Sequence, residues 1–272
     1  MSDKEFGKYS LAELRQVHEM IQLFLEQKPE LLEAIIEDEN GFVENLPVGF
    51  RWADLYCHSF LQICMFSLHY VGAEGELAKA AKSDNPQAYV LNELPKFDVS
   101  VKEPESSLLT GKQNLVAINL ALFRSLDSML LYGKSLSRLV DEAADGNMDS
   151  LFKAVSIDHS VVSNAVVAGY ITVAEMEDDR DFFKSLASAL SKRPKKTNLD
   201  YGPLRYFLAM LSEVDVLDTL SEEDSYQLFC VELGLYDPDN KLEDPSGSLK
   251  QFIQRWRKDQ ATSNPDFVSS SS

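Results

Sequence analysis

Residues 112–131 read KQNLVAINLALFRSLDSMLL, and this stretch decides the fold class of the chain. Its apolar side chains recur every three or four positions, which places them on one face of an α-helix. The residues on that face are Leu115, Ile118, Leu122, Leu126 and Met129. The spacing predicts a long helix packed against a core, and Gly133 ends it.

The chain that follows this helix shows the same helical spacing as far as residue 258. Ser160 and Ser221 precede apolar-periodic stretches and are predicted helix N-caps, whereas Gly234 is a predicted helix end. Pro203 suits the first turn of a helix. The helices expected here span residues 135–144, 149–155, 160–177, 181–190, 203–212, 221–234 and 248–258.

The chain before residue 112 is also mostly helical in pattern. Ser10 and Glu13 form a capping-box pair, which predicts that a helix starts there. Residues 97–101 alternate apolar and polar side chains, which fits a short strand or, better, an extended linker. The helices expected here span residues 10–27, 29–39, 48–71, 74–82 and 87–94.

These patterns predict an all-α protein, a multi-helix bundle built from two packed helical subdomains. Residues 95–107 interrupt the helical spacing, so the division is expected there. We therefore expect an N-terminal helical domain over 1–96, a C-terminal helical domain over 107–258, and a disordered tail over 259–272.

Composition is that of a soluble globular protein. The 272 residues are 44% hydrophobic and 26% charged, so the chain buries a core and is not a disordered acidic polymer. The formal net charge of −18 repels nucleic acid at long range. Any binding of nucleic acid must therefore come from a local basic surface.

Cysteine usage and the absence of sorting signals predict a cytoplasmic protein. Cys57, Cys64 and Cys230 are too few for a disulfide framework, and their apolar surroundings predict buried thiols in a reducing compartment. The N-terminus lacks the apolar run of a signal peptide. Residues 50–71 are the most apolar long segment, but charged and polar residues interrupt it. We therefore expect a buried helix there and no membrane partner.

Basic residues gather in two short runs near the C-terminus, which hold 8 of the 26 lysines and arginines. If the chain binds a phosphate backbone, these runs are the expected contacts. An internal role is the favoured alternative, because the acidic segment 222–244 is a nearby partner and Trp256 is in register with the apolar face of its helix. The candidate nucleic-acid-binding residues are Lys192, Arg193, Lys195, Lys196, Lys250, Arg255, Arg257 and Lys258.

Candidate metal ligands are few. Asp54 and His58 are spaced one helical turn apart, with Gln62 continuing the same face, but two ligands do not make a site. Hydrogen bonding inside a helical core is the favoured interpretation of these side chains. The acidic loops that begin at Asp145 and Asp237 lack the glycine and the glutamate of a calcium-binding EF-hand. No metal site is predicted.

Catalytic motifs also fail their tests. Gly111-Lys112 precedes a helix but lacks the first glycine and the following Ser or Thr of a P-loop. Asp158, His159 and Ser160 are consecutive, whereas the members of a catalytic triad converge from separate positions. We therefore predict no catalytic residue and no bound cofactor.

The C-terminal half carries a resemblance. Residues 147–190, with the stretch SLFKAVSID at 150–158, resemble a helical segment of uncharacterised bacterial proteins. The resemblance extends through YGPL at 201–204 and LKQFIQR at 249–255. It implies a bacterial or phage origin, and no activity comes with it.

The sequence thus favours a non-enzymatic helical interaction protein, such as a regulatory or assembly subunit of a bacterial or phage system, with a protein partner. The first alternative is a nucleic-acid-associated protein that binds through the two basic runs. The second is a helical metal-dependent enzyme centred on Asp54 and His58. The oligomeric state stays open at this point.

Overall fold

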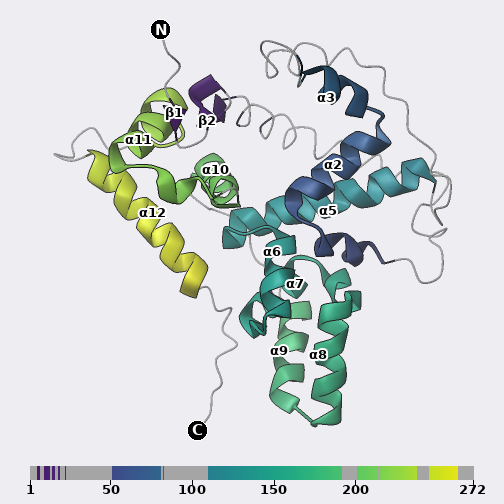
Figure 1. Cartoon of the computed structure of the whole chain (residues 1–272). Coiled ribbons are helices and arrows are strands. Elements are labelled where there is room, and N and C mark those ends of the chain that lie inside the picture. The colour runs from purple at the N-terminus through teal and green to yellow at the C-terminus, as the bar shows by residue number, and fades with distance from the viewer. Residues whose placement is uncertain are drawn as a thin grey trace. The chain divides into compact units, whose positions relative to one another are not determined.

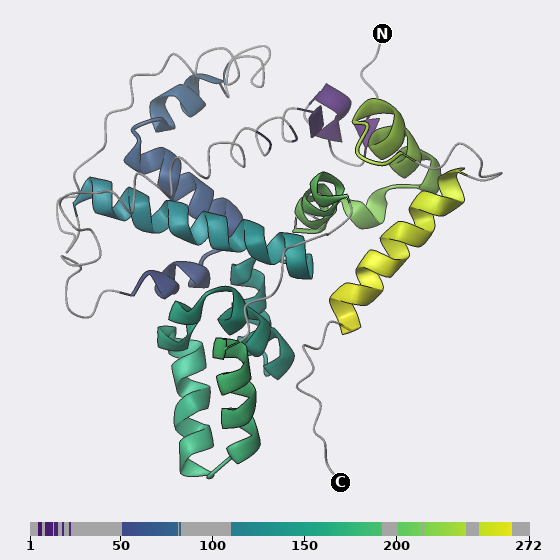
Figure 2. The same cartoon turned by 180° about the vertical axis from the view of Figure 1, so that it is seen from behind.

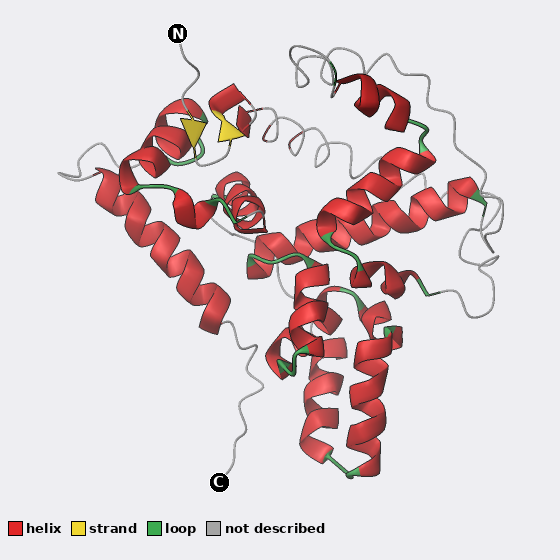
Figure 3. Cartoon of the chain, in the orientation of Figure 1, coloured by secondary structure: helices red, strands yellow, loops and turns green. Residues whose placement is uncertain are grey.

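The computed structural model describes residues 5–6, 9–12, 14–15, 18, 22, 51–80, 82, 110–191, 201–213, 215–237 and 245–262. Helices account for most of these residues, which confirms the predicted all-α class (Figure 1, Figure 3). The strands among them are β1 (Glu5–Phe6) and β2 (Tyr9–Ser10), which pair antiparallel with Glu5 opposite Ser10.

Several expectations fall wholly or partly outside the described residues. The helices expected over 29–39 and 87–94 and the extended stretch 97–101 cannot be compared with the structure. In the expected helix 10–27, the described positions from Leu11 onward are helical, as predicted.

The chain folds as two compact units. The N-terminal unit consists of residues 12–123, and the C-terminal unit consists of residues 1–11 together with 124–272. Helix α5 (Gly111–Tyr132) contributes residues to both. The division that the sequence predicts near 96–107 lies outside the described residues.

The N-terminal unit breaks the helix that the sequence predicts over 48–71. The chain instead forms the 3₁₀-helix η1 (Trp52–Cys57), then α2 (Phe60–Tyr70), and then α3 (Glu74–Ala80). Ser59 separates the first two, because its Oγ accepts from Gln62 N at 3.3 Å while Gln62 Oε1 accepts from Ser59 N at 2.8 Å. This reciprocal capping box satisfies the N–H groups at the break, so the prediction of one continuous helix was wrong.

The C-terminal unit begins with a series of short, capped helices. Ser135 Oγ, Asn147 Oδ1 and Asn164 Oδ1 each accept a backbone N–H at the start of α6, α7 and α8. Asp158, and not the predicted Ser160, caps the turn before α8, since Asp158 Oδ1 accepts from Ser160 N at 2.9 Å. The elements are α6 (Leu136–Ala144), α7 (Met148–Ile157), the 3₁₀-helix η3 (His159–Ser163), α8 (Ala165–Met176) and α9 (Arg180–Ser191).

These helices pack around α7. Helix α6 contacts α7 and α8, and α7 contacts α9. Helices α8 and α9 form an antiparallel hairpin, and both views of the chain show them side by side (Figure 1, Figure 2). Leu139, Leu151, Val155, Val167 and Leu186 are buried in this packing.

The rest of the C-terminal unit agrees with the predicted pattern. Ser221 caps its helix by accepting from Asp224 N at 3.0 Å, and Gly234 has a φ of 59°, which suits a helix end. The last helix runs to Thr262, into the stretch expected as a tail, and residues 263–272 lie outside the described ones. The elements are α10 (Gly202–Glu213), the 3₁₀-helix η4 (Leu217–Thr219), α11 (Glu222–Tyr226), the π-helical turn η5 (Gln227–Glu232) and α12 (Pro245–Thr262).

Helix α5 buries the apolar face that its spacing predicts. Ile118, Leu122, Leu126 and Met129 are at most 5% exposed, and Leu115 is half-buried. By length and composition, residues 113–132 are also apolar enough to cross a membrane, but 56% of that stretch is buried inside the protein. The core helix of a globular protein passes the same test.

Candidate protein-interaction surface

The predicted nucleic-acid-binding residues fall into two groups. The first run, Lys192, Arg193, Lys195 and Lys196, lies outside the described residues. The second group, Lys250, Arg255, Arg257 and Lys258, lies on α12 with exposed side chains.

Helix α12 is partly neutralised by acidic residues of its own unit. Lys250 Nζ forms an ion pair with Glu222, and Arg257 donates to Asp218 Oδ1 at 2.6 Å. Trp256 is 3% exposed, which confirms its predicted place in the core. The side of α12 toward α11 is therefore engaged within the chain, by buried apolar residues and by these two ion pairs.

Asp54 and His58 do not share a helical face. Asp54 lies in η1 and pairs with Arg51 at 3.1 Å, whereas His58 follows η1 and packs edge-on against Phe66 with ring centroids 5.1 Å apart. Both line a cavity of about 320 Å³ in the N-terminal unit. Within the described ranges, no group of three or more His, Cys, Asp or Glu side chains is placed to hold a metal ion.

The cysteines are free thiols, and the prediction that all three are buried is wrong for one of them. Cys57 is exposed and not in the core, because it lies in η1 and not on the α-helix expected there. Burial raises the pKa of the Cys64 thiol and that of the Cys230 thiol to about 11 each. These two thiols stay protonated near neutral pH and are weak nucleophiles.

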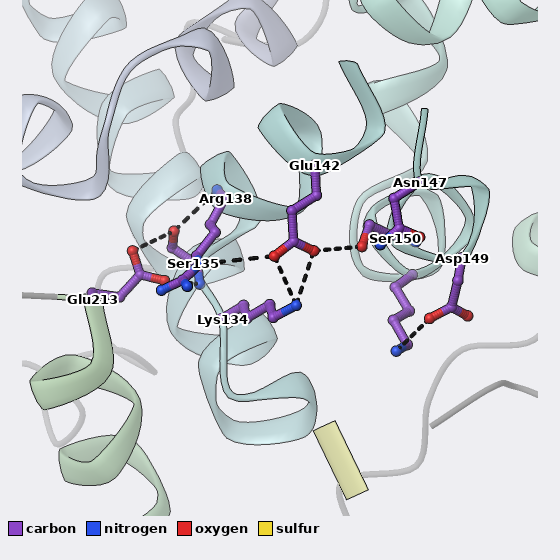
Figure 4. A network of polar contacts seen from close by, with 9 residues as sticks. Lys134, Ser135, Arg138, Glu142, Asn147, Asp149, Ser150 and Glu213 are labelled. Atoms are coloured by element: carbon purple, nitrogen blue, oxygen red, sulfur yellow. Dashed lines mark hydrogen bonds and ion pairs between the residues drawn. The ribbon is translucent and has the colours of Figure 1, made fainter. Parts of the chain in front are cut away.

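One carboxylate of α6 ties that helix to α7 (Figure 4). Glu142 accepts from Lys134 Nζ at 2.9 Å and from Ser150 Oγ at 2.6 Å. Burial raises the pKa of Glu142, but the hydrogen bonds from Lys134 and Ser150 and the charges of Lys134 and Arg138 outweigh it and lower the pKa. The carboxylate is therefore ionised and fully engaged, as suits a structural link between helices.

Two more polar contacts connect α6 and α7 to neighbouring helices. Glu213 of α10 accepts the Ser135 N–H at 2.8 Å and so joins α10 to the start of α6. Lys153 of α7 is buried, yet its Nζ pairs with Asp149 Oδ2 at 2.6 Å and lies 5.7 Å from the centroid of the Tyr132 ring. The pairing of Lys153 with Asp149 compensates the burial of its charge, and its contact with Tyr132 places α7 beside α5. The Glu213 contact holds α10 at the start of α6.

Helix α8 carries apolar residues around most of its circumference, and yet half of its twelve residues are exposed. Its residues 165–174 read AVVAGYITVA without a charge, and such a helix is normally buried. Only Val167 and Ala174 of α8 are buried, whereas Val173 is 49% and Met176 is 84% exposed. The exposed residues of α8 are Glu175 and five uncharged residues, which we call the docking face: Ala165, Gly169, Thr172, Val173 and Met176. Contiguous exposed apolar surface of this kind is typical of interaction sites.

The hydroxyl of Thr172 does not make the docking face polar. Its Oγ1 donates to the carbonyl of Ala168 at 2.9 Å, one turn earlier in α8. The hydroxyl is thus satisfied within its own helix.

An acidic turn adjoins the C-terminal end of the docking face. Residues 175–181 read EMEDDRD and carry five carboxylates but a single arginine. Arg180 pairs with Asp178 at 3.3 Å, and Lys184 of α9 pairs with Asp181 at 3.1 Å. Asp179 caps α9 instead, because its Oδ1 accepts from Phe182 N at 2.9 Å. Negative charge therefore remains in excess at this end of the hairpin.

The frame behind the docking face is rigidly built. Tyr170 of α8 donates its hydroxyl to the Ala143 carbonyl of α6 at 2.9 Å, and Phe182 of α9 packs on Phe152 of α7 with centroids 5.6 Å apart. Val167 is fully buried on the inner side of α8. The docking face is thus held in place by the packing of its opposite side.

The sequence predicts a helix over 160–177 but does not predict which of its sides is exposed. The available signal was the absence of charge on any side of residues 165–174. This signal predicts burial, and only the packed structure shows that six of the twelve residues of α8 are exposed.

Comparison of the chain with protein-family models, with curated proteins and with solved structures found no match. The resemblance of residues 147–190 to bacterial helical proteins therefore stays a prediction.

Proposed function

We propose that this chain is a non-enzymatic interaction protein that binds a protein partner through the docking face of α8. The observation that carries the proposal is the exposure of Val173 and Met176 on a helix whose residues 165–174 carry no charge. Leaving apolar surface in water costs about 25 cal/mol per Å². Covering this face would recover that free energy, which is the ordinary driving force of protein association.

The structural support of α8 fits this role. Its inner side is fixed by Val167 and by the hydrogen bond from Tyr170 to Ala143, so the outer side is presented without rearrangement. A face that is already ordered loses little conformational entropy on binding. This is the property expected of a regulatory or assembly subunit that works by docking.

The test is photo-crosslinking of the full-length chain in the organism that carries it. A photoreactive amino acid replaces Val173 on the docking face, and the matched control places it at Asp141, which is exposed on α6. We expect a discrete protein adduct at position 173 and none at position 141. Absence of a defined adduct at position 173, or equal adducts at both positions, would refute the proposal.

A second candidate function is nucleic-acid binding through α12, which the exposed Arg255 favours. Its Nε donates to the Gln251 carbonyl of its own helix at 3.3 Å, and none of the described acidic side chains forms an ion pair with it. The test is the affinity for a labelled DNA duplex of the wild type and of a variant in which Arg255, Arg257 and Lys258 are all alanine. Binding through α12 predicts weaker, less salt-dependent affinity in the variant. Unchanged affinity would remove this candidate.

A further inference from the structure

The N-terminal unit contains a cavity of about 320 Å³, which is at the small end of the range of about 300–1,000 Å³ for ligand pockets. Described residues of η1, α2 and the start of α5 line it, and both views of the chain show α2 beside α5 (Figure 1, Figure 2). At one side of the cavity Arg51 and His58 are exposed, whereas Ala117 and Ile118 of α5 are buried. The cavity therefore leads from the surface of the unit to α5.

The helix break at Ser59 brings the walls of this cavity together. Trp52 lies in η1, whereas Phe66 lies in α2. In one continuous helix the two residues would be about 21 Å apart along the axis, because an α-helix rises about 1.5 Å per residue. The capping box of Ser59 ends one element and starts the next, and both side chains line the same cavity.

Aromatic side chains form much of the cavity wall. Trp52, Phe66 and Tyr70 line it and are half-buried, so part of their ring surface is not covered by the protein. The His58 ring is nearly perpendicular to the Phe66 ring, at an interplanar angle of 87°. Aromatic side chains bind flat ring systems by stacking and by edge contacts. The wall thus suits a planar ligand.

Several polar groups of the cavity have hydrogen-bonding capacity left. Asp54 uses its Oδ2 on Arg51 at 3.1 Å, and no described group donates to its Oδ1. Among the described residues, the Tyr70 hydroxyl and the ring nitrogens of His58 also form no hydrogen bond. A carboxylate only accepts, whereas a tyrosine hydroxyl and a neutral imidazole both donate and accept. These groups match a ligand that carries an N–H donor beside an acceptor.

We propose that this cavity binds an uncharged nucleobase, free or as its nucleoside. A nucleobase is flat, stacks on aromatic side chains, and presents N–H donors and nitrogen or oxygen acceptors on its edges. The inference goes beyond the proposed function, because the cavity belongs to the N-terminal unit and the docking face belongs to the C-terminal unit.

Other ligand classes fit this cavity less well. A phosphorylated nucleotide would meet an Arg51 that is already paired with Asp54, and the net charge of −18 repels an anion. A purely aliphatic ligand would displace water from Asp54 and Tyr70 without replacing its hydrogen bonds. A sugar alone would supply hydroxyl groups but no flat surface for Trp52.

The first experiment uses the two tryptophans of the chain as fluorescent reporters. Trp52 lines the cavity, whereas Trp256 is 3% exposed in the C-terminal unit. The full-length chain is titrated with adenosine, guanosine, cytidine and uridine. We expect saturable quenching by at least one nucleoside in the wild type, and loss of this quenching in Trp52→Phe. Calorimetry should still detect binding to Trp52→Phe, since a phenyl ring also stacks.

Two results of this titration would overturn the inference. One is that none of the four nucleosides binds saturably to the wild type. The other is quenching that persists in Trp52→Phe, because the ligand would then lie away from the cavity.

The second experiment tests the acceptor. Asp54→Asn removes the carboxylate, and Asp145→Asn is the matched control at an exposed aspartate of the C-terminal unit. We expect Asp54→Asn to weaken nucleoside binding at least about tenfold, because a hydrogen bond to a charged group is lost. Asp145→Asn should leave the affinity unchanged. Equal affinities of the two variants would overturn the inference.

The third experiment fills the cavity from α5. Ala117 lines the cavity, whereas Ala121, one turn later, is fully buried outside the cavity lining. We expect Ala117→Leu to keep the wild-type midpoint of urea unfolding and to lose at least about tenfold in nucleoside affinity. Ala121→Leu overpacks a filled site and should lower the midpoint. Equal losses of stability in the two variants would show that α5 has no free space beside Ala117, and would overturn the inference.

The last comparison tests whether the ligand is uncharged. Each nucleoside is compared with its monophosphate and with a single-stranded oligonucleotide of the same base, at one salt concentration. We expect the nucleoside to bind most tightly. Tighter binding of the monophosphate or of the oligonucleotide, weakened by added salt, would assign the cavity to an anionic ligand and overturn the inference.

Discussion

Helices α12 and α8 both suggest an interaction surface, but only α8 keeps its apolar side uncovered. In α12 the apolar stripe that includes Trp256 is buried, and Lys250 and Arg257 pair with Glu222 and Asp218 of the same unit. In α8 the inner side packs on the frame while Val173 and Met176 face solvent. An amphipathic helix can bury its single apolar side within its own chain. A helix that is apolar on several sides and packs with only one of them leaves apolar surface exposed.

The largest expected contrast is between truncations of the two helices. Trp256→Ala should destabilise the C-terminal unit by about 3–5 kcal/mol, because it leaves a cavity in a packed core. Met176→Ala should change the free energy of unfolding by less than about 0.5 kcal/mol, since the side chain is 84% exposed. Urea unfolding followed by circular dichroism measures both. Similar losses in the two variants would mean that α8 is also part of a core.

The second contrast concerns the frame behind α8 and its dependence on pH. Glu142→Gln should destabilise the C-terminal unit by about 1–3 kcal/mol at neutral pH, because it weakens charge-assisted hydrogen bonds between α6 and α7. The pKa of Glu142 is lowered in the folded state, so its contribution is present above the ordinary glutamate value of about 4.3 and is lost as the pH falls through the folded value.

The measurement is the difference in unfolding free energy between the wild type and Glu142→Gln across that pH range. The difference should shrink on acidification, and Glu177→Gln on the exposed turn is the matched control for a Glu→Gln change on the surface. A difference that stays constant with pH would contradict the role assigned to the Glu142 charge.

The third contrast separates folding from docking on α8 itself. Gly169→Ala should raise the free energy of unfolding by roughly 1 kcal/mol, since Gly169 is exposed inside a helix with free space for a Cβ. Gly75→Ala should raise it less, because Gly75 is the second residue of α3. Thermal unfolding checks this. If Gly169→Ala destabilises the chain, the glycine has a role in the fold.

The smallest expected effect is on the ion pairs of α12. Asp218→Asn removes the partner of Arg257, but the two side chains are 84% and 47% exposed, so solvent screens the pair. We expect a loss of less than about 1 kcal/mol, which diminishes as salt is added. A larger loss in urea unfolding would show that the pair fixes α12 more firmly than its exposure suggests.

Local signals predicted the elements of this fold where one signal acted alone. The apolar spacing of Ile118, Leu122 and Met129 predicted the buried face of α5, and Ser221 predicted the start of α11. Where two signals competed, the prediction was wrong. Ser59 starts a new helix inside an apolar run that had suggested a single one, and Asp158 provides the cap that had been assigned to Ser160.

The candidate site was predicted only in part. The basic residues of α12 were identified, but the pairing of Arg257 with Asp218 depends on side chains 39 positions apart. The docking face was missed, because exposure of Val173 depends on which neighbours reach α8. No pattern within residues 165–176 contains that information.

The sequence by itself determined the all-α class, the cap of α11, and the apolar face of α5, because each of these depends on residues a few positions apart. The tertiary structure alone decided that the apolar side of α12 is buried and that apolar residues of α8 are exposed, since burial depends on side chains brought together from distant parts of the chain. For the same reason, the sequence shows that α8 is apolar, and only the fold shows that part of this apolar surface is left exposed.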